Sequence, residues 1–172
     1  MKQTNNILFL CLRYLLLLLI AVPNFYLFYK ILTPLTLQVS YFLLSLFFQV
    51  ELINNTLIIS EYFIDIIPAC VAASAYYLLL ILNLTIPMQT KQRIKLIPLS
   101  LLILFSFNIV RIFIFSILFV NDFVFFEVLH YFFWYFLSIF IVVGIWFFET
   151  KIFKIKAIPF YTDIKFLIKQ LR

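Results

Sequence analysis

The strongest constraint on the fold of this chain comes from its two longest apolar runs, residues 94–120 and 123–148. Each run exceeds the roughly 20 residues that a helix needs to cross about 30 Å of hydrocarbon. Lipid offers no hydrogen-bond partner to the backbone, so runs of this length are expected to be helical. Because 66% of the 172 residues are hydrophobic, no water-soluble surface can be assembled. We therefore predict an all-α, polytopic membrane helix bundle.

Five membrane-spanning helices are expected from the apolar stretches along the chain. They cover residues 7–29, 34–51, 69–87, 96–119 and 124–148. We expect residues 1–150 to form the transmembrane bundle and residues 151–172 to form a basic amphipathic cytoplasmic tail. The first apolar stretch is longer than the core of a signal peptide and no small-residue cleavage site follows it, which favours an uncleaved span.

Charged residues between the spans predict the orientation. Basic residues gather in the short loop 91–95 and in the tail, and the positive-inside rule places both in the cytoplasm. The opposite span ends carry the acidic residues Glu51, Glu61, Asp65, Asp122 and Glu127. This arrangement puts the N-terminus outside, where Lys2 and Arg13 fit the rule less well. The net charge of +6 is spread over loops and tail, so no nucleic-acid partner is expected.

Residues 52–67 lack the pattern of a span. The pair Asn54-Asn55 is a turn signal, and β-branched residues follow it. Hydrophobic side chains then alternate with other residues at Tyr62, Ile64 and Ile66. We predict a small extended or hairpin element on the outer surface, just before the third span.

Three residues with reactive or charged side chains lie near the outer ends of three different spans: Cys70, Arg111 and His130. Cys70 follows Pro68, and proline is favoured in a first helical turn, so we expect the thiol within that turn. Arg111 lies about 10 Å into its apolar run, a depth at which an unpaired guanidinium is costly. His130 is the only histidine, and an imidazole can take up and return a proton near neutral pH. The three together predict a cysteine-based active site.

Four further residues are candidates for supporting or substrate-binding roles: Asn108, Ser74, Asp122 and Glu127. Asn108 lies one turn from Arg111 on the same helix face, and either acidic residue would be able to orient the imidazole of His130. Each member of the trio also has a structural interpretation. A cysteine can be a small membrane residue, as expected for Cys11, Arg111 can pair with an acidic residue, and a lone histidine often only packs.

The residues around the trio resemble the exosortase/archaeosortase family of membrane transpeptidases. The resemblance rests on three segments in the order Cys, Arg, His, namely residues 68–79, residues 107–112 and Leu129-His130, and it covers about residues 50–148. Many members carry Cys-Ser-Gly or Cys-Thr-Gly and a small residue after the histidine. Here Val71-Ala72 follows the cysteine and bulkier side chains follow the histidine, which leaves the trio itself intact. The compact size is closer to the archaeal branch than to the longer bacterial enzymes.

The resemblance implies a thiol protease or transpeptidase in a prokaryotic cell membrane, with its active site facing outside. Its substrates would be exported proteins that end in a short motif, a transmembrane helix and a basic tail, and a membrane lipid would be a possible acceptor. Cys70 would be the nucleophile, His130 the base and then the acid, and Arg111 the stabiliser of negative charge. No metal or organic cofactor is expected. The alternatives are a small transporter or channel-like protein and a non-catalytic family member that binds sorting signals.

Overall fold

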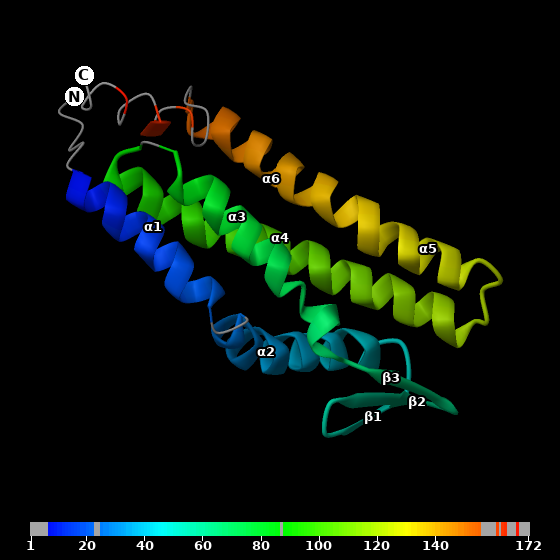
Figure 1. Cartoon of the computed structure of the whole chain (residues 1–172). Helices are drawn as coiled ribbons and strands as arrows, with labels where there is room; N and C mark the ends of the chain where they lie inside the picture. The colour runs from blue at the N-terminus through cyan, green and yellow to red at the C-terminus, as the bar shows by residue number, and fades with distance from the viewer. Residues whose placement is uncertain are drawn as a thin grey trace.

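The computed structural model describes residues 7–22, 25–86, 88–155, 161, 163, 164 and 168. Helices α1 (Ile7–Ala21), α3 (Ala73–Leu84), α4 (Thr90–Val120) and α6 (Ser138–Ile152) form a bundle (Figure 1). Helix α5 (Phe126–Phe132) continues through the π-helical turn η2 (Phe133–Leu137) into α6, so the last helix is unbroken. Most of the expected basic tail, residues 151–172, lies outside the described residues.

Three helices are long and apolar enough to cross a membrane: α2 (Tyr26–Ser45), α4 and the unbroken helix Phe126–Ile152. The helices α1 and α3 are apolar but shorter. The described part of the chain is thus mostly helical, as predicted, with five helices when α5 and α6 are taken as one. A small β-sheet accompanies them.

The expected boundary between the first two helices is wrong. α1 ends at Ala21 and α2 begins at Tyr26, so the expected span 7–29 is divided, and Pro34 lies inside α2. A proline disfavours helical geometry in the residue before it, and Pro23 stands at the end of α1 in the sequence. Proline inside a membrane helix is tolerated because neighbouring groups can satisfy the freed backbone carbonyl.

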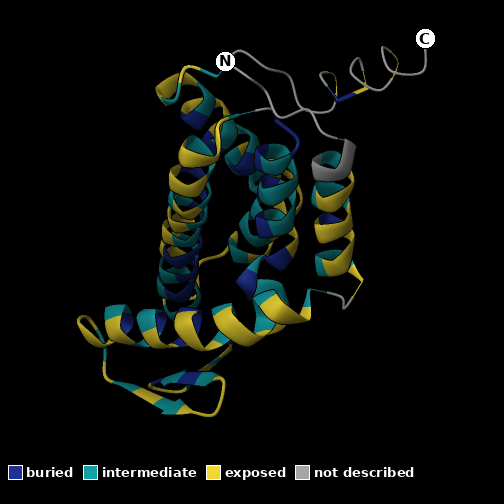
Figure 2. Cartoon of the chain, turned by 90° about the vertical axis from the view of Figure 1, so that its left-hand side faces the viewer, coloured by how far each residue is buried: buried dark blue, intermediate teal, exposed yellow. Residues whose placement is uncertain are grey.

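Helix α2 lies across one end of the bundle, next to the sheet (Figure 2). We call this the sheet end, which also holds the loop between α4 and α5. The opposite end holds the loop between α3 and α4, the start of α4 and the last turn of α6, and we call it the basic end because Lys91, Arg93 and Lys95 lie there.

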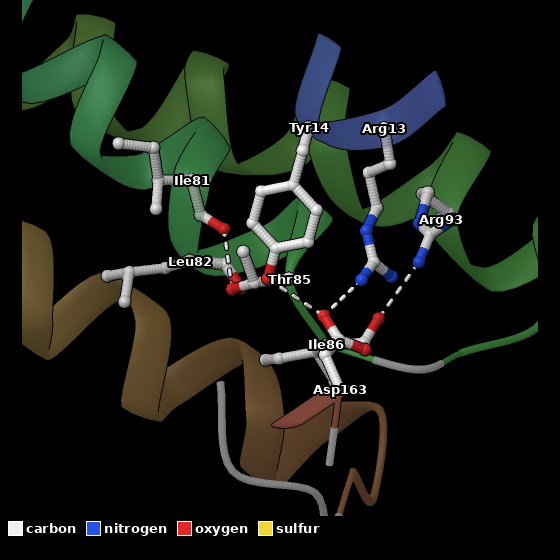
Figure 3. A network of polar contacts seen from close by, with 8 residues as sticks. All are labelled: Arg13, Tyr14, Ile81, Leu82, Thr85, Ile86, Arg93 and Asp163. Carbon is white, nitrogen blue, oxygen red and sulfur yellow. Dashed lines mark hydrogen bonds and ion pairs between the residues drawn. The ribbon is translucent and has the colours of Figure 1, made fainter. Parts of the chain in front are cut away.

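Arg13 of α1 belongs to the basic end. It forms an ion pair with Asp163, whose carboxylate also accepts a hydrogen bond from Tyr14 at 3.0 Å (Figure 3). Arg93 lies beside this pair and donates to the carbonyl of Ile86 at 2.8 Å. The expectation that Arg13 lies at the other end from the basic loop is therefore wrong. The expectation required α2 to return through the bundle, but α2 crosses the end of the bundle instead (Figure 2).

The predicted extended element is a three-stranded antiparallel meander of β1 (Val50–Ile53), β2 (Thr56–Ile59) and β3 (Tyr62–Asp65). Two-residue turns join the strands, and their first residues, Asn54 and Ser60, both have φ of 55°. Short polar side chains tolerate this left-handed conformation, which tight hairpin turns require. The prediction of a hairpin element after Asn54-Asn55 is confirmed.

Two groups of buried side chains hold the elements together. The first joins α2, the sheet and α4, and consists of Leu37, Leu44, Leu57, Ile59, Ile66 and Ile112. The second joins α3, α4 and α6, and consists of Tyr76, Leu79, Leu104, Val142 and Ile145. Cys70 packs against the first group, so the sheet and α2 form one side of its surroundings.

Candidate functional site

Cys70 lies in a short 3-10 turn, η1 (Pro68–Val71), that follows the sheet. Its N–H donates to the carbonyl of Ile67 at 2.8 Å. As predicted, the cysteine follows Pro68 in a helical turn, but this turn is separate from helix α3. Ala72 adopts a left-handed conformation with φ of 58° and separates η1 from α3. The thiol therefore lies in a linker between the sheet and the bundle.

Asn108 and Arg111 of α4 both point to the backbone of this linker. The Asn108 Nδ2 donates to the carbonyl oxygen of Cys70 at 3.0 Å, and the Arg111 Nη2 donates to the same oxygen at 3.2 Å. Residues three apart share a helix face, which is why one carbonyl can reach both. Among the described residues, Arg111 forms no ion pair with Asp122 or Glu127, the acidic partners considered above.

His130 lies on α5 among aromatic rings. It stacks on Phe126, with ring centroids 5.7 Å apart and planes 9° apart, and it meets the ring of Phe115 edge to face at 5.4 Å. The π-helical turn η2 begins three residues later, at Phe133. The carbonyl of Phe133 accepts a hydrogen bond from the hydroxyl of Ser138 at 2.9 Å. Such π-turns inside helices often occur at functional sites.

The guanidinium of Arg111 lies near the other two members of the trio. It is close enough to interact electrostatically with the Cys70 thiol, the His130 imidazole and the Tyr76 hydroxyl. Arg111 thus hydrogen-bonds to the backbone of Cys70 and lies within electrostatic range of His130, while no hydrogen bond joins His130 to Cys70 in the described part of the chain. Tyr76 is a further neighbour of the guanidinium that no pattern in the sequence indicated. Its hydroxyl is buried and has no hydrogen-bond partner among the described residues.

The structure places the other supporting candidates farther from this cluster. Ser74 is exposed on α3, and Glu127 is exposed in the first turn of α5. Asp122 accepts a hydrogen bond from the Tyr62 hydroxyl at 2.7 Å and so ties the sheet to the loop after α4. This hydrogen bond raises the pKa of Tyr62 above its ordinary value. Neither acidic residue forms a hydrogen bond or an ion pair with His130 in the described structure.

The thiol itself has one weak partner. The Sγ of Cys70 lies 3.9 Å from the carbonyl oxygen of Asp65 at the end of β3. Both cysteines are free, and Cys11 is exposed on α1. The described residues contain no group of three or more His, Cys, Asp or Glu side chains that would hold a metal ion.

Comparison of the chain with protein-family models, with curated proteins and with solved structures found no match. The function is therefore inferred from the residues of the site and from their arrangement.

Proposed function

We propose that this protein is a membrane cysteine endopeptidase or transpeptidase with Cys70, Arg111 and His130 as its active centre. One observation carries the proposal. The guanidinium of Arg111 on α4 donates a hydrogen bond to the carbonyl of Cys70, 41 residues earlier in the sequence, and lies within electrostatic range of the Cys70 thiol and of His130 on α5. A thiol, a cation and an imidazole are the groups that acyl transfer through a thioester requires.

The backbone at Ala72 supports the resemblance to exosortases and archaeosortases. In the family sequences Cys-Ser-Gly and Cys-Thr-Gly, the glycine stands two residues after the cysteine, which is position 72 here. Ala72 has φ of 58°, a conformation that glycine adopts without strain and that alanine disfavours. A glycine at this position would adopt the same left-handed conformation without strain, so the family sequence is compatible with this turn.

Each group has a defined part in the proposed reaction. His130 takes the proton from the Cys70 thiol, and the thiolate attacks the scissile carbonyl carbon. Arg111 stabilises the oxyanion that forms, because one of its five N–H donors is engaged by the Cys70 carbonyl and others are left for the substrate. Collapse of the tetrahedral intermediate breaks the C–N bond, the leaving amine takes the proton from His130, and a thioester remains on Cys70.

The second half of the reaction repeats the steps with a new nucleophile. Water, or the amine or hydroxyl of a lipid, gives a proton to His130 and attacks the thioester. The thiolate of Cys70 leaves and regains the proton. For both proton transfers the imidazole must come within about 3 Å of the thiol, directly or through one water molecule, and hydrogen bonds of this kind often tighten only when substrate is bound.

The proposed substrates and location follow from the two ends of the bundle. The basic end would face the cytoplasm and the sheet end would face outside. A substrate with a short motif, a transmembrane helix and a basic C-terminal end would then present its motif to Cys70 just outside the membrane. A lipid whose headgroup carries an amine or a hydroxyl would lie at the same depth as the thioester.

The test is co-expression with a protein from the same genome that ends in such a tripartite signal. We expect processing by the wild type and its loss in Cys70→Ala, Arg111→Ala and His130→Ala. Cys11→Ala is the matched control, because this second cysteine is exposed on α1 and should be dispensable. Unchanged processing in all three variants would disprove the proposal, provided that each variant is present in the membrane at the wild-type level.

A second candidate function is a non-catalytic receptor for sorting signals. The observation that favours it is that Asn108 and Arg111 contact the Cys70 carbonyl rather than the thiol, so both already have a structural role. Mass spectrometry separates the two functions. A substrate fragment joined to Cys70 through a thioester supports catalysis, whereas copurification of an intact signal with wild type and Cys70→Ala alike supports binding alone.

A further inference from the structure

Three polar side chains meet inside the bundle at the basic end, away from the proposed active centre. They are Asn83 of α3, Ser100 of α4 and Glu149 of α6, and each is at most 1% exposed. The Ser100 hydroxyl donates to Glu149 Oε2 at 2.7 Å. The Asn83 Nδ2 lies 3.3 Å from the same oxygen and 2.7 Å from Ser100 Oγ. One carboxyl thus joins three helices.

This cluster has more acceptors than donors. Glu149 Oε1 and Asn83 Oδ1 are both buried without a hydrogen-bond partner among the described residues. The single proton of the Ser100 hydroxyl is also shared, since the carbonyl of Leu96 lies 2.8 Å from Ser100 Oγ. An unpaired carboxylate in such surroundings costs several kcal/mol, and an acceptor left unpaired costs about 1–3 kcal/mol.

No cation compensates Glu149 in the part of the chain that the structure describes. The one ion pair there joins Arg13 and Asp163. The titratable or charged side chains on α3, on the first half of α4 and at the end of α6 are Tyr76, Tyr77, Lys91, Arg93, Lys95 and Lys151. None of them is within salt-bridge distance of Glu149. A charged Glu149 would therefore stand alone among neutral groups.

We propose that Glu149 is a proton-binding site, with the proton on Oε1 and Asn83 Oδ1 as its acceptor. One proton then satisfies both buried oxygens. Together with the contact between Asn83 Nδ2 and Glu149 Oε2, it makes a two-bond pairing between a carboxylic acid and an amide. A metal ion fits less well, because hard cations take six or more oxygen ligands and the cluster offers two without partners.

Occupancy of the site governs the packing of α3, α4 and α6. When the proton leaves, Glu149 carries a buried charge that no cation among the described residues compensates, and the contact between the three helices weakens. The protein should therefore hold together best when Glu149 is protonated and loosen as the pH rises. Glu149→Gln imitates the protonated acid, since its amide can donate to Asn83 Oδ1 and accept from Ser100 at once.

Infrared spectroscopy of the full chain in lipid nanodiscs tests the proposal. At neutral pH we expect the C=O band of a protonated carboxyl, a shift of this band in D₂O and its loss in Glu149→Gln. Glu61→Gln is the matched control, because Glu61 is exposed in a turn of the sheet, and it should keep the band. Absence of the band from the wild type, or its persistence in Glu149→Gln, would overturn the proposal.

Two further measurements keep the proposal testable if Glu149→Gln folds poorly. In Asn83→Leu the proton loses its acceptor, so the band should move to higher frequency. In thermal unfolding in detergent, the melting temperature of the wild type should fall from neutral to alkaline pH more steeply than that of Asn83→Leu and Glu149→Gln. Identical pH profiles, or stabilisation of the wild type by Na⁺ without any protonated band, would contradict a proton site.

Discussion

The two polar clusters of this bundle have opposite balances of hydrogen-bonding groups. At the sheet end, Asn108 and Arg111 direct their donors at one acceptor, the carbonyl of Cys70. At the basic end, Glu149 and Asn83 retain two buried acceptor oxygens that have no donor among the described residues. Helix α4 contributes to both clusters: it supplies both donors at the sheet end, whereas at the basic end it supplies the Ser100 hydroxyl and the two unpaired acceptors come from α3 and α6.

The balance of donors and acceptors in a polar cluster indicates which ligand the cluster can bind within an apolar bundle. A cluster with a fixed cation and donors to spare suits a ligand that brings negative charge, such as the oxyanion of acyl transfer. A cluster with acceptors to spare suits a proton. Counting donors and acceptors thus separates two sites that hydropathy alone would treat as equivalent interruptions of apolar runs.

The largest expected effect comes from removing the spare donors at the sheet end. Arg111→Met should lower the rate of substrate processing by about 10²–10³-fold, as expected for the loss of one oxyanion donor. Arg111→Lys should restore part of the rate, because it keeps the charge without the planar fork of donors. The measurement is the rate of substrate cleavage in isolated membranes. A normal rate in Arg111→Met would reduce Arg111 to a structural partner of the Cys70 carbonyl.

The next effect concerns the basic end, where the cluster has fewer hydrogen-bond donors than acceptors. Ser100→Ala should lower the free energy of unfolding by about 1–3 kcal/mol, because it leaves Glu149 Oε2 short of a donor. Ser106→Ala is the matched control, since its hydroxyl bonds only to the carbonyl of Leu102 on an exposed face of the same helix. This control should change stability by no more than about 0.5 kcal/mol. Denaturant titration in detergent measures both, and equal losses would show that the cluster is not special.

A smaller effect is expected at Ala72, which holds Cys70 apart from α3. Ala72→Gly should raise the free energy of unfolding by up to about 1 kcal/mol, because glycine relieves the left-handed strain at φ of 58°. Ala75→Gly, in the first turn of α3, should instead lower it by up to about 1 kcal/mol. The same unfolding assay compares the two. If both glycines destabilise equally, the left-handed turn does not strain the chain.

The smallest effect concerns the attachment of the sheet. Neutral Tyr62 donates to Asp122, which raises the pKa of the phenol in the folded protein. The attachment is therefore fully present below the ordinary pKa of tyrosine and is lost as the pH rises through the higher folded value. Difference absorbance titration of wild type against Tyr62→Phe isolates this phenol. Its ionisation should move to lower pH in Asp122→Asn, and an unchanged titration there would rule out Asp122 as the cause.

Local features of the sequence allowed the sheet and the later helices to be predicted. Asn54-Asn55 and the alternation around Tyr62 act over a few residues, and the strands form there. Long apolar runs likewise predicted α4 and the unbroken last helix. The division between Ala21 and Tyr26 and the inclusion of Pro34 in α2 were missed, because whether a helix tolerates a proline depends on what surrounds it in the fold.

The candidate site was predicted in part. Cys70, Arg111 and His130 were chosen as chemical exceptions in apolar runs, and the structure shows a hydrogen bond from Arg111 to the Cys70 carbonyl, with His130 within electrostatic range of the guanidinium. Tyr76 and the cluster of Asn83, Ser100 and Glu149 were missed. An acidic residue away from the outer span ends was an available signal for Glu149, but its partners lie 49 and 66 residues away in the sequence. No local pattern indicates such pairings.

The amino-acid sequence by itself determined the long apolar helices, the turns of the sheet and the clustering of basic residues toward one end. These properties depend on run length, turn chemistry and charge, which act over a few neighbouring residues. Only the tertiary structure decided that α2 crosses the end of the bundle, that Arg13 lies beside Arg93, and that donors gather at Cys70 while acceptors gather at Glu149. These outcomes depend on which side chains of distant helices fit against one another, and packing at that range is settled only when the whole bundle forms.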